Sequence, residues 1–388
     1  MERSLHLNRD KAFHRQRRRV WDNAFKTSLS TYAPDVEHFT DQLLAKLRSE
    51  NGQLIPLSEY TSHYSYDAMA ALAFGKSMGF IKGEQSDVAA SILSTFTNSV
   101  QALGYMYHMP WLMNTIGVLT SFAGPMKEWR DWSVSQMRAR MKVRTIHVTN
   151  PPQIQPLTLL QVRDARPDLI SHLIVSTPKT PEGCELLFGE SRLIISAGSE
   201  TTSTALAFIF MHLATRPHYM TAIRTEFLAN AHSYDCQHPL PLLEAVIYES
   251  LRIWPSVFFG SQRVTPPEGM EINGHFVPGN TIVHIPLFPL FHDPRNFVAP
   301  DEFIPERWTT RPELVRNRAA FIPFSTGPYS CAGKALAMME LRSVVGRVIA
   351  EFDVRLDEGV DVSAYWEGIK DHFTAGAPKV MVRFVKVT

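Results

Sequence analysis

The chain has 388 residues, of which 45% are hydrophobic and 20% are charged, and its formal net charge is +1. This is a soluble globular composition with enough residues for one large or two ordinary domains, and the near-neutral charge gives no reason to expect nucleic acid as a partner. The three cysteines make no disulfide framework. No signal peptide is expected, because the N-terminus lacks an apolar core, and no apolar run approaches the ~20 residues of a membrane span.

The first predicted helix carries a basic face. Val20, Trp21 and Phe25 have the spacing of buried positions on one side of a helix. His14 and Arg18 are four residues apart, so they share another face. Two such donors could bind a dicarboxylate, and the alternatives are a solvated basic face or a nuclear-import tract.

Helical patterns with short breaks at Gly and Pro continue over residues 33–142. Within them the aromatic side chains of residues 94–111 are consistent with ordinary core packing. The prolines of residues 148–167 predict a linker between helices, and those of residues 178–183 predict a further loop.

The longest predicted helix covers about Leu186 to Thr215 and ends before Pro217. Its centre reads Ala-Gly-Ser-Glu-Thr-Thr, which is unusual for a buried helix. The hydroxyl of Thr201 can bond the carbonyl of Ala197, four residues back, and this would open a notch beside Gly198. Such an irregularity often has a function, although a polar patch on a surface helix is the plainer alternative.

The next predicted helix, Pro241 to Ile253, places Glu249 and Arg252 on one face. Exposed, such a pair contributes less than ~1 kcal/mol. Farther along, a Pro-Glu-Arg-Trp segment contains Arg307. Short strands are expected between these two segments, joined by a hairpin turn at Asn273-Gly274, and residues 373–376 predict the tip of a last hairpin.

One loop then delivers a cysteine to the start of a helix. Proline and glycine on both sides of Gly327 exclude regular structure, and strong helix formers begin at Lys334. Cys331 is therefore expected at a helix N-terminus, where the dipole favours an anion and lowers the pKa of a thiol. Because the loop holds no His to act as a base, a thiolate there suits one axial bond to a haem iron; the alternative is a free, buried cysteine.

This loop resembles the cysteine loop of the cytochrome P450 haem-thiolate monooxygenases, whose pattern is Phe-x-x-Gly-x-Arg-x-Cys-x-Gly. The chain matches it at Phe324, Gly327, Cys331 and Gly333, and departs from it at Tyr329, where the family has an Arg that pairs with a haem propionate. The helix centre, the Glu-x-x-Arg pair and the Pro-Glu-Arg-Trp segment follow the family's order. The resemblance implies a single domain over residues 1–388, mainly α with a small β portion, which begins at about the family's helix C without its anchor, first helices and part of its small sheet.

The resemblance also implies a role for each site residue. Gly198 would make room for dioxygen, while Glu200 and Thr201 would relay protons during oxygen activation. The residues that bind haem b, with Cys331 as axial ligand, would be His14, Arg18, Arg263, Phe324, Gly327, Cys331 and Gly333. A buried group of Glu249, Arg252 and Arg307 would brace the cysteine loop, and residues 94–111 would roof the substrate pocket.

The implied reaction is insertion of one oxygen atom of O2 into an apolar small-molecule substrate, and the implied setting is secondary metabolism. Electrons would come from an NADPH-dependent flavin reductase. Full-length relatives would lie on the cytosolic face of the endoplasmic reticulum membrane, although no anchor is expected in this chain. Two alternatives are a truncated, non-catalytic relative and a haem-thiolate isomerase or dehydratase that does not use O2; the Glu200-Thr201 pair argues against the second.

Overall fold

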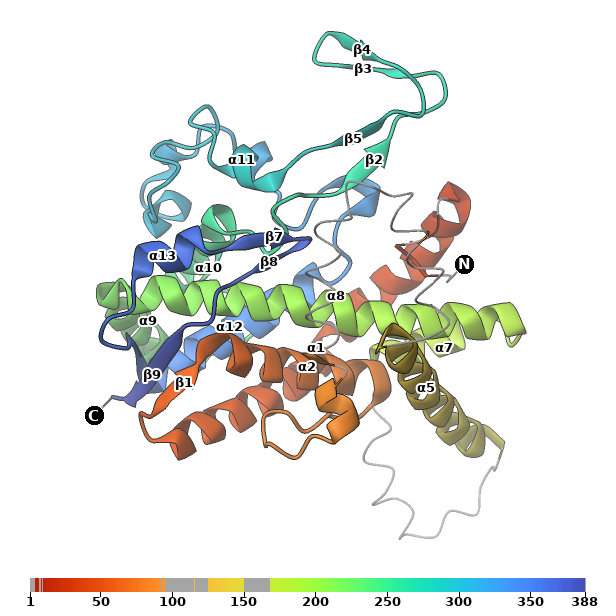
Figure 1. Ribbon diagram of the computed structural model, residues 1–388, viewed down its shortest axis with the longest axis horizontal. Helices are drawn as coiled ribbons and strands as arrows, with labels where there is room; N and C mark the ends of the chain where they lie inside the picture. Colours follow the sequence, from red (N-terminus) through yellow and green to blue (C-terminus); the bar gives the residue numbers. More distant parts are fainter. Residues whose placement is uncertain are drawn as a thin grey trace.

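The computed structural model describes residues 4–6, 8, 10–91, 93–94, 115, 125–149 and 168–387. Helices dominate these residues, and the strands form small separate sheets (Figure 1). Most of the predicted pocket roof, residues 94–111, and of the predicted linker, residues 148–167, lies outside the described residues. The described α-helices are α1 Lys11–Glu50, α2 Leu57–Phe74, α5 Pro125–Thr149, α7 Leu169–Val175, α8 Pro181–Ala214, α9 Pro217–Ala229, α10 Pro241–Ile253, α11 Leu287–Phe291, α12 Lys334–Glu351 and α13 Val362–Glu367.

Every strand pairing among the described residues is antiparallel. One three-stranded sheet has the order β1 (Leu54–Pro56), β9 (Met381–Lys386), β6 (Phe352–Leu356), and three pairs stand apart from it. These pairs are β2 (Gln262–Val264) with β5 (Ile282–His284), β3 (Met270–Ile272) with β4 (His275–Val277), and β7 (Lys370–His372) with β8 (Thr374–Gly376). The expected mainly α fold with a small β portion is confirmed.

The two hairpins predicted from the sequence are both present. Asn273 and Gly274 connect β3 to β4 with positive φ angles of 50° and 78°, the backbone twist that a two-residue hairpin needs. This hairpin projects away from the helices (Figure 1). The last hairpin turns at Phe373, between β7 and β8, so the tip predicted over residues 373–376 is correct only at its first residue, because residues 374–376 form β8.

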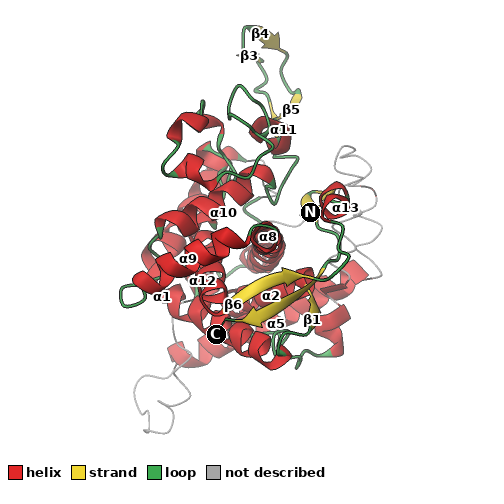
Figure 2. Cartoon of the chain, turned by 90° about the vertical axis from the view of Figure 1, so that its left-hand side faces the viewer, coloured by secondary structure: helices red, strands yellow, loops and turns green. Residues whose placement is uncertain are grey.

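Helix α8 runs through the middle of the molecule and is surrounded by other elements when seen end-on (Figure 2). It begins at Pro181, so the loop predicted over residues 178–183 is wrong in its second half. The side chain of Thr180 caps the helix by accepting from the N–H of Gly183, and Pro181 occupies the first turn. A proline is tolerated there because the N–H that it lacks has no partner within the helix.

Two apolar clusters share α8. Toward its C-terminal half, Phe208 packs with residues of α10, α12 and the three-stranded sheet. Toward its N-terminal half, Ile195 packs in a cluster with Trp21 of α1 and with Leu336 and Met339 of α12. The start of α12, which follows the cysteine loop, is therefore packed into the same cluster as the part of α8 just before its polar centre.

By length and composition α8 could span a membrane, but 67% of its most apolar stretch is buried within the protein, and the core helix of a globular protein has the same properties.

Candidate functional site

The cysteine loop folds back on itself just before α12. The backbone N–H of Cys331 donates to the carbonyl of Phe324 at 2.8 Å, which closes the loop. Gly327 starts a short 3₁₀ turn with φ at +75°, a conformation that suits glycine. Helix α12 then begins at Lys334. The prediction that an irregular loop delivers Cys331 to the start of a helix is thus confirmed.

Gly333 lies next to the sulfur of Cys331, and the space beside this glycine is open. A Cβ added to Gly333 would meet only the sulfur, at 3.9 Å. Although Cys331 is exposed at the surface, desolvation by the surrounding protein raises the pKa of its thiol, against the lowering effects of the Gly333 and Lys334 N–H groups and of the Arg18 charge. The prediction that this setting lowers the thiol pKa is therefore wrong, because desolvation outweighs the helix terminus. A metal ion deprotonates a thiol that it binds, so the raised pKa is compatible with a ligand role.

Three of the predicted cofactor-binding side chains meet at the two residues before Cys331. The ring of His14 lies 4.4 Å from the ring of Tyr329, and the guanidinium of Arg263 lies over the same ring at 5.3 Å. Arg18 donates to the carbonyl of Ser330. Residues of α1 and β2 therefore converge on a loop that is remote from both in sequence.

The surroundings of His14 lower the pKa of its side chain. Burial, with the charges of Arg18 and Arg263, lowers the pKa of its imidazole. His14 is consequently a neutral donor near neutral pH, while the two arginines carry the positive charge. The structure thus places a phenol ring where the family pattern has an arginine, and keeps two other guanidinium groups close by.

The centre of α8 has the irregularity that its sequence predicts. The hydroxyl of Thr201 donates to the carbonyl of Ala197 at 2.7 Å, which confirms the predicted bond. The hydroxyl of Ser256, in the segment after α10, donates to the carbonyl of Thr201 at 2.7 Å. Ser256 was missed from the sequence, because no local pattern connects it to a helix more than fifty residues earlier.

The other two predicted residues of this region face α2. A Cβ added to Gly198 would lie 2.5 Å from Cε of Met69, so the glycine allows α2 and α8 to approach closely. The hydroxyl of Tyr66 donates to Glu200 at 2.5 Å, and burial raises the pKa of that carboxyl. Space for dioxygen at Gly198 and a relay through Glu200 both remain predictions.

The predicted ionic brace is fully buried. Glu249 accepts from Nη2 of Arg252 at 2.8 Å and from Nε of Arg307 at 2.9 Å, and all three side chains are 0% exposed. The indole N–H of Trp308 donates to the other carboxylate oxygen of Glu249 at 2.9 Å. Burial shields the group from solvent, so removing one partner would leave an uncompensated charge.

This brace reaches the cysteine loop through aromatic rings. Trp308 packs against Phe321 with a centroid distance of 4.4 Å, and Phe321 also packs against Tyr248 at 5.5 Å. Phe321 begins the segment that leads to Cys331. The contact supports the prediction that Glu249, Arg252 and Arg307 position the loop.

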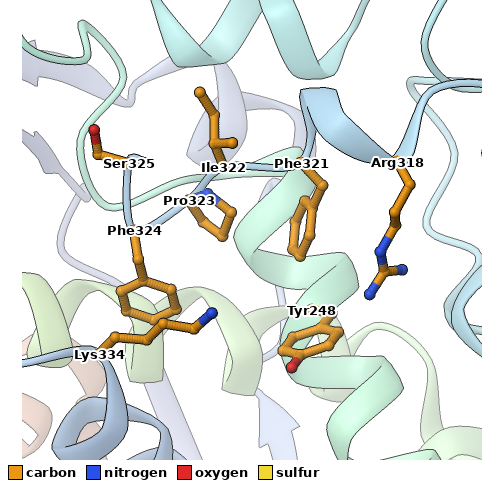
Figure 3. A pocket seen from close by; sticks show the side chains of 8 residues that line it. All are labelled: Tyr248, Arg318, Phe321, Ile322, Pro323, Phe324, Ser325 and Lys334. Atoms are coloured by element: carbon orange, nitrogen blue, oxygen red, sulfur yellow. The ribbon is translucent and has the colours of Figure 1, made fainter. Parts of the chain in front are cut away.

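A cavity of about 220 Å³ opens beside the same segment, between α10 and the start of α12 (Figure 3). Phe324 lines it, and Nζ of Lys334 lies 5.8 Å from the Phe324 ring. The lining residues are Tyr248, Arg318, Phe321, Ile322, Pro323, Phe324, Ser325 and Lys334. Cys331 and His14 do not line this cavity, so it is separate from the cluster of donors described above.

The donor set fits an iron porphyrin. A single sulfur, with backbone N–H groups directed at it, suits an axial iron ligand. His14, Arg18 and Arg263 are nitrogen donors of the kind that bind carboxylates such as haem propionates. The sulfur and the nitrogen donors occur on or beside one short loop. An iron porphyrin, which carries propionate groups, requires both.

The comparisons with known proteins agree with this donor set. A family model described as Cytochrome P450 matches residues 2–381. The chain is 32% identical to a cytochrome P450 monooxygenase (orf5) of Eupenicillium brefeldianum, over 99% of this chain and 75% of that protein. It is 32% identical to a cytochrome P450 monooxygenase (notG') of Aspergillus versicolor, over 98% and 68%. It is 31% identical to a tryprostatin B 6-hydroxylase of Neosartorya fischeri, over 98% and 67%.

Proposed function

Because the chain belongs to the cytochrome P450 family and is an enzyme of its monooxygenase class, we propose that it inserts one oxygen atom of O2 into an apolar small molecule. Haem b is the proposed cofactor, with Cys331 as its axial ligand. The tryprostatin B 6-hydroxylase among its relatives supports a role in secondary metabolism. We propose that residues 1–388 act as one haem-thiolate domain.

The observation that carries this proposal is the convergence of His14, Arg18 and Arg263 on the two residues before Cys331. Two guanidinium groups and a neutral imidazole supply donors for carboxylates, and the thiol supplies a ligand for iron. When bound, haem supplies the activation of dioxygen, while the protein supplies binding, orientation and protons. Phe324, Gly327 and Gly333 shape the loop that holds the sulfur.

Proton supply is assigned to the polar centre of α8. The hydroxyl of Thr201 is exposed and bonds a carbonyl of its own helix, so it can turn toward a partner in the site. Because burial raises the pKa of Glu200, its carboxyl holds a proton to a higher pH than an ordinary glutamate does. These two groups support a reaction that consumes protons with O2 rather than an isomerase or dehydratase reaction.

A redox partner follows from the family, because P450 monooxygenases generally depend on an external source of electrons. We propose an NADPH-dependent flavin reductase as that partner. We also propose the cytosolic face of the endoplasmic reticulum membrane as the location of its full-length relatives.

The test is to express the chain with such a reductase, supply haem and screen apolar compounds for spectral binding. Compounds that bind are then turned over under isotopically labelled dioxygen. We expect labelled product that requires both NADPH and the reductase. Turnover without the reductase would favour the isomerase or dehydratase, and a chain without a Soret band after haem addition would favour the non-catalytic alternative.

A further inference from the structure

Helix α2 packs side by side with α8 (Figures 1 and 2). Around Gly198 the two helices approach until Met69 fills the space that a Cβ would need. Ser199 donates to the carbonyl of Ser65 at 3.3 Å. The surroundings of Glu200, which follows directly, are therefore set mainly by α2.

Tyr66 is the side chain of α2 that reaches Glu200. It is 1% exposed, and its hydroxyl donates to Oε1 of Glu200 at 2.5 Å. A donor that binds the charged form of a carboxylate stabilises that form and opposes the effect of burial. The pKa of the tyrosine itself is raised well above its ordinary value by burial and by Glu200, so Tyr66 stays a neutral donor.

No other titratable group acts on Glu200 within the described part of the chain. Asp67, the next residue of α2, accepts from the N–H groups of Met78, Gly79 and Ile81 and is engaged there. Glu190, three turns earlier on α8, is paired with Arg17. Among the residues that the structure describes, the proton affinity of Glu200 therefore depends on burial and on one hydroxyl.

We propose that Tyr66 is a positioning residue for Glu200, whose hydroxyl holds the carboxyl on the α2 side of the notch and makes its proton easier to release. This inference rests on the proposed function, because it assigns a partner to the predicted proton relay. Consecutive residues of a helix point about 100° apart, so Glu200 and Thr201 do not lie on one face. Tyr66 therefore sets the position of the Glu200 carboxyl before a proton moves from it toward Thr201.

The first test is an infrared pH titration of the Glu200 carboxyl in the full chain, identified by the band that Glu200→Gln removes. In Tyr66→Phe we expect the midpoint to rise by roughly one pH unit, a tenfold gain in proton affinity, because burial is no longer opposed. The matched control is Tyr64→Phe. Tyr64 is equally buried on the same helix, but the charged group that acts on it most is Glu340.

An unchanged midpoint in Tyr66→Phe, or an equal change in Tyr64→Phe, would overturn the proposal. The infrared titration does not depend on turnover. It therefore tests the role of Tyr66 even if the wild-type chain shows no reductase-dependent NADPH oxidation, which is the result that would contradict the proposed function.

A second test uses turnover with a reductase. Peroxide released per NADPH should depend on pH, and Tyr66→Phe should move that dependence to higher pH. In the Glu200→Gln background the same change should have no further effect on this pH dependence, since the proposed effect of the tyrosine on proton delivery passes through the carboxyl. Additive effects of the two substitutions would assign Tyr66 a purely structural role and contradict the inference.

Discussion

The hydroxyl of Thr201 donates to the carbonyl of Ala197, and the carbonyl of Thr201 in turn accepts from Ser256. A hydroxyl that bonds a backbone carbonyl of its own helix is held in place but can exchange that partner for another. The Thr201 hydroxyl is therefore a proton donor that stays at one place on α8 and can change its hydrogen-bond partner.

Replacing Thr201 with Ala should uncouple electron use from product formation. Without the hydroxyl, protons are delivered less effectively, and we expect the peroxide released per NADPH to rise several-fold while haem binding is retained. Thr201→Ser is the matched control, because it keeps the hydroxyl and should stay close to wild type. Equal peroxide release from wild type and Thr201→Ala would contradict the proposed relay.

Replacing Cys331 with Ala should abolish the red-shifted carbonyl spectrum of a thiolate-ligated haem. The chain offers two control cysteines, and Cys184 is the better one because it is only partly buried, whereas Cys236 is in the core. Cys184→Ala should keep the full spectrum. A thiolate spectrum that survives in Cys331→Ala would show that the ligand assignment is wrong.

The buried ionic group predicts a large loss of stability. Glu249→Gln leaves Arg252 and Arg307 buried without a counter-charge and should lower the free energy of unfolding by about 3–5 kcal/mol. The variant should also lose bound haem. The control is Arg311→Ala. Arg311 pairs with Glu313 at 3.6 Å while both side chains are more than half exposed, so its loss should cost less than about 1 kcal/mol.

These effects are measured by urea unfolding and by haem content after purification. If the two variants are equally stable, the group around Glu249 does not position the loop.

Local relationships in the site could be predicted from the sequence. The bond between Thr201 and Ala197 spans one helical turn, and Glu249 and Arg252 are three apart on one helix, so helix geometry alone brings each pair together. The bounds of α10 and the hairpin turn at Asn273 follow from equally local signals.

Relationships between distant elements could not be predicted in this way. The contact of His14 with Tyr329 and the bond from Tyr66 to Glu200 depend on how whole helices pack, which no spacing rule contains. The pKa of Cys331 has the same origin. Its helix-terminal position was predicted correctly, but the surrounding protein, which only the fold determines, sets the direction of the shift.

The close approach at Gly198 predicts a coupling with Met69. In Gly198→Ala the new methyl group would lie 2.5 Å from Cε of Met69, and forcing it in should cost about 1–3 kcal/mol. Because Met69 is the obstacle, the same substitution should cost much less in a Met69→Ala background. A double-mutant cycle by urea unfolding measures this difference, and an unchanged cost in the second background would assign Gly198 to another role.

The last prediction concerns Glu340, a carboxyl of α12 that is 1% exposed. Burial raises its pKa to about 8, and Thr202 of α8 opposes this. Between the ordinary carboxyl pKa near 4.5 and about 8, the folded state binds more protons than the unfolded state, so the free energy of unfolding should fall as pH rises, by at most about 5 kcal/mol.

Glu340→Gln should remove this slope and stabilise the protein at about pH 8, as measured by urea unfolding from about pH 5 to about pH 9. Glu351→Gln is the control, because the pKa of Glu351 is lowered by Arg48 and its loss should leave the slope in place. A slope that persists in Glu340→Gln would show that it does not come from the Glu340 carboxyl, which would contradict the raised pKa assigned to that group.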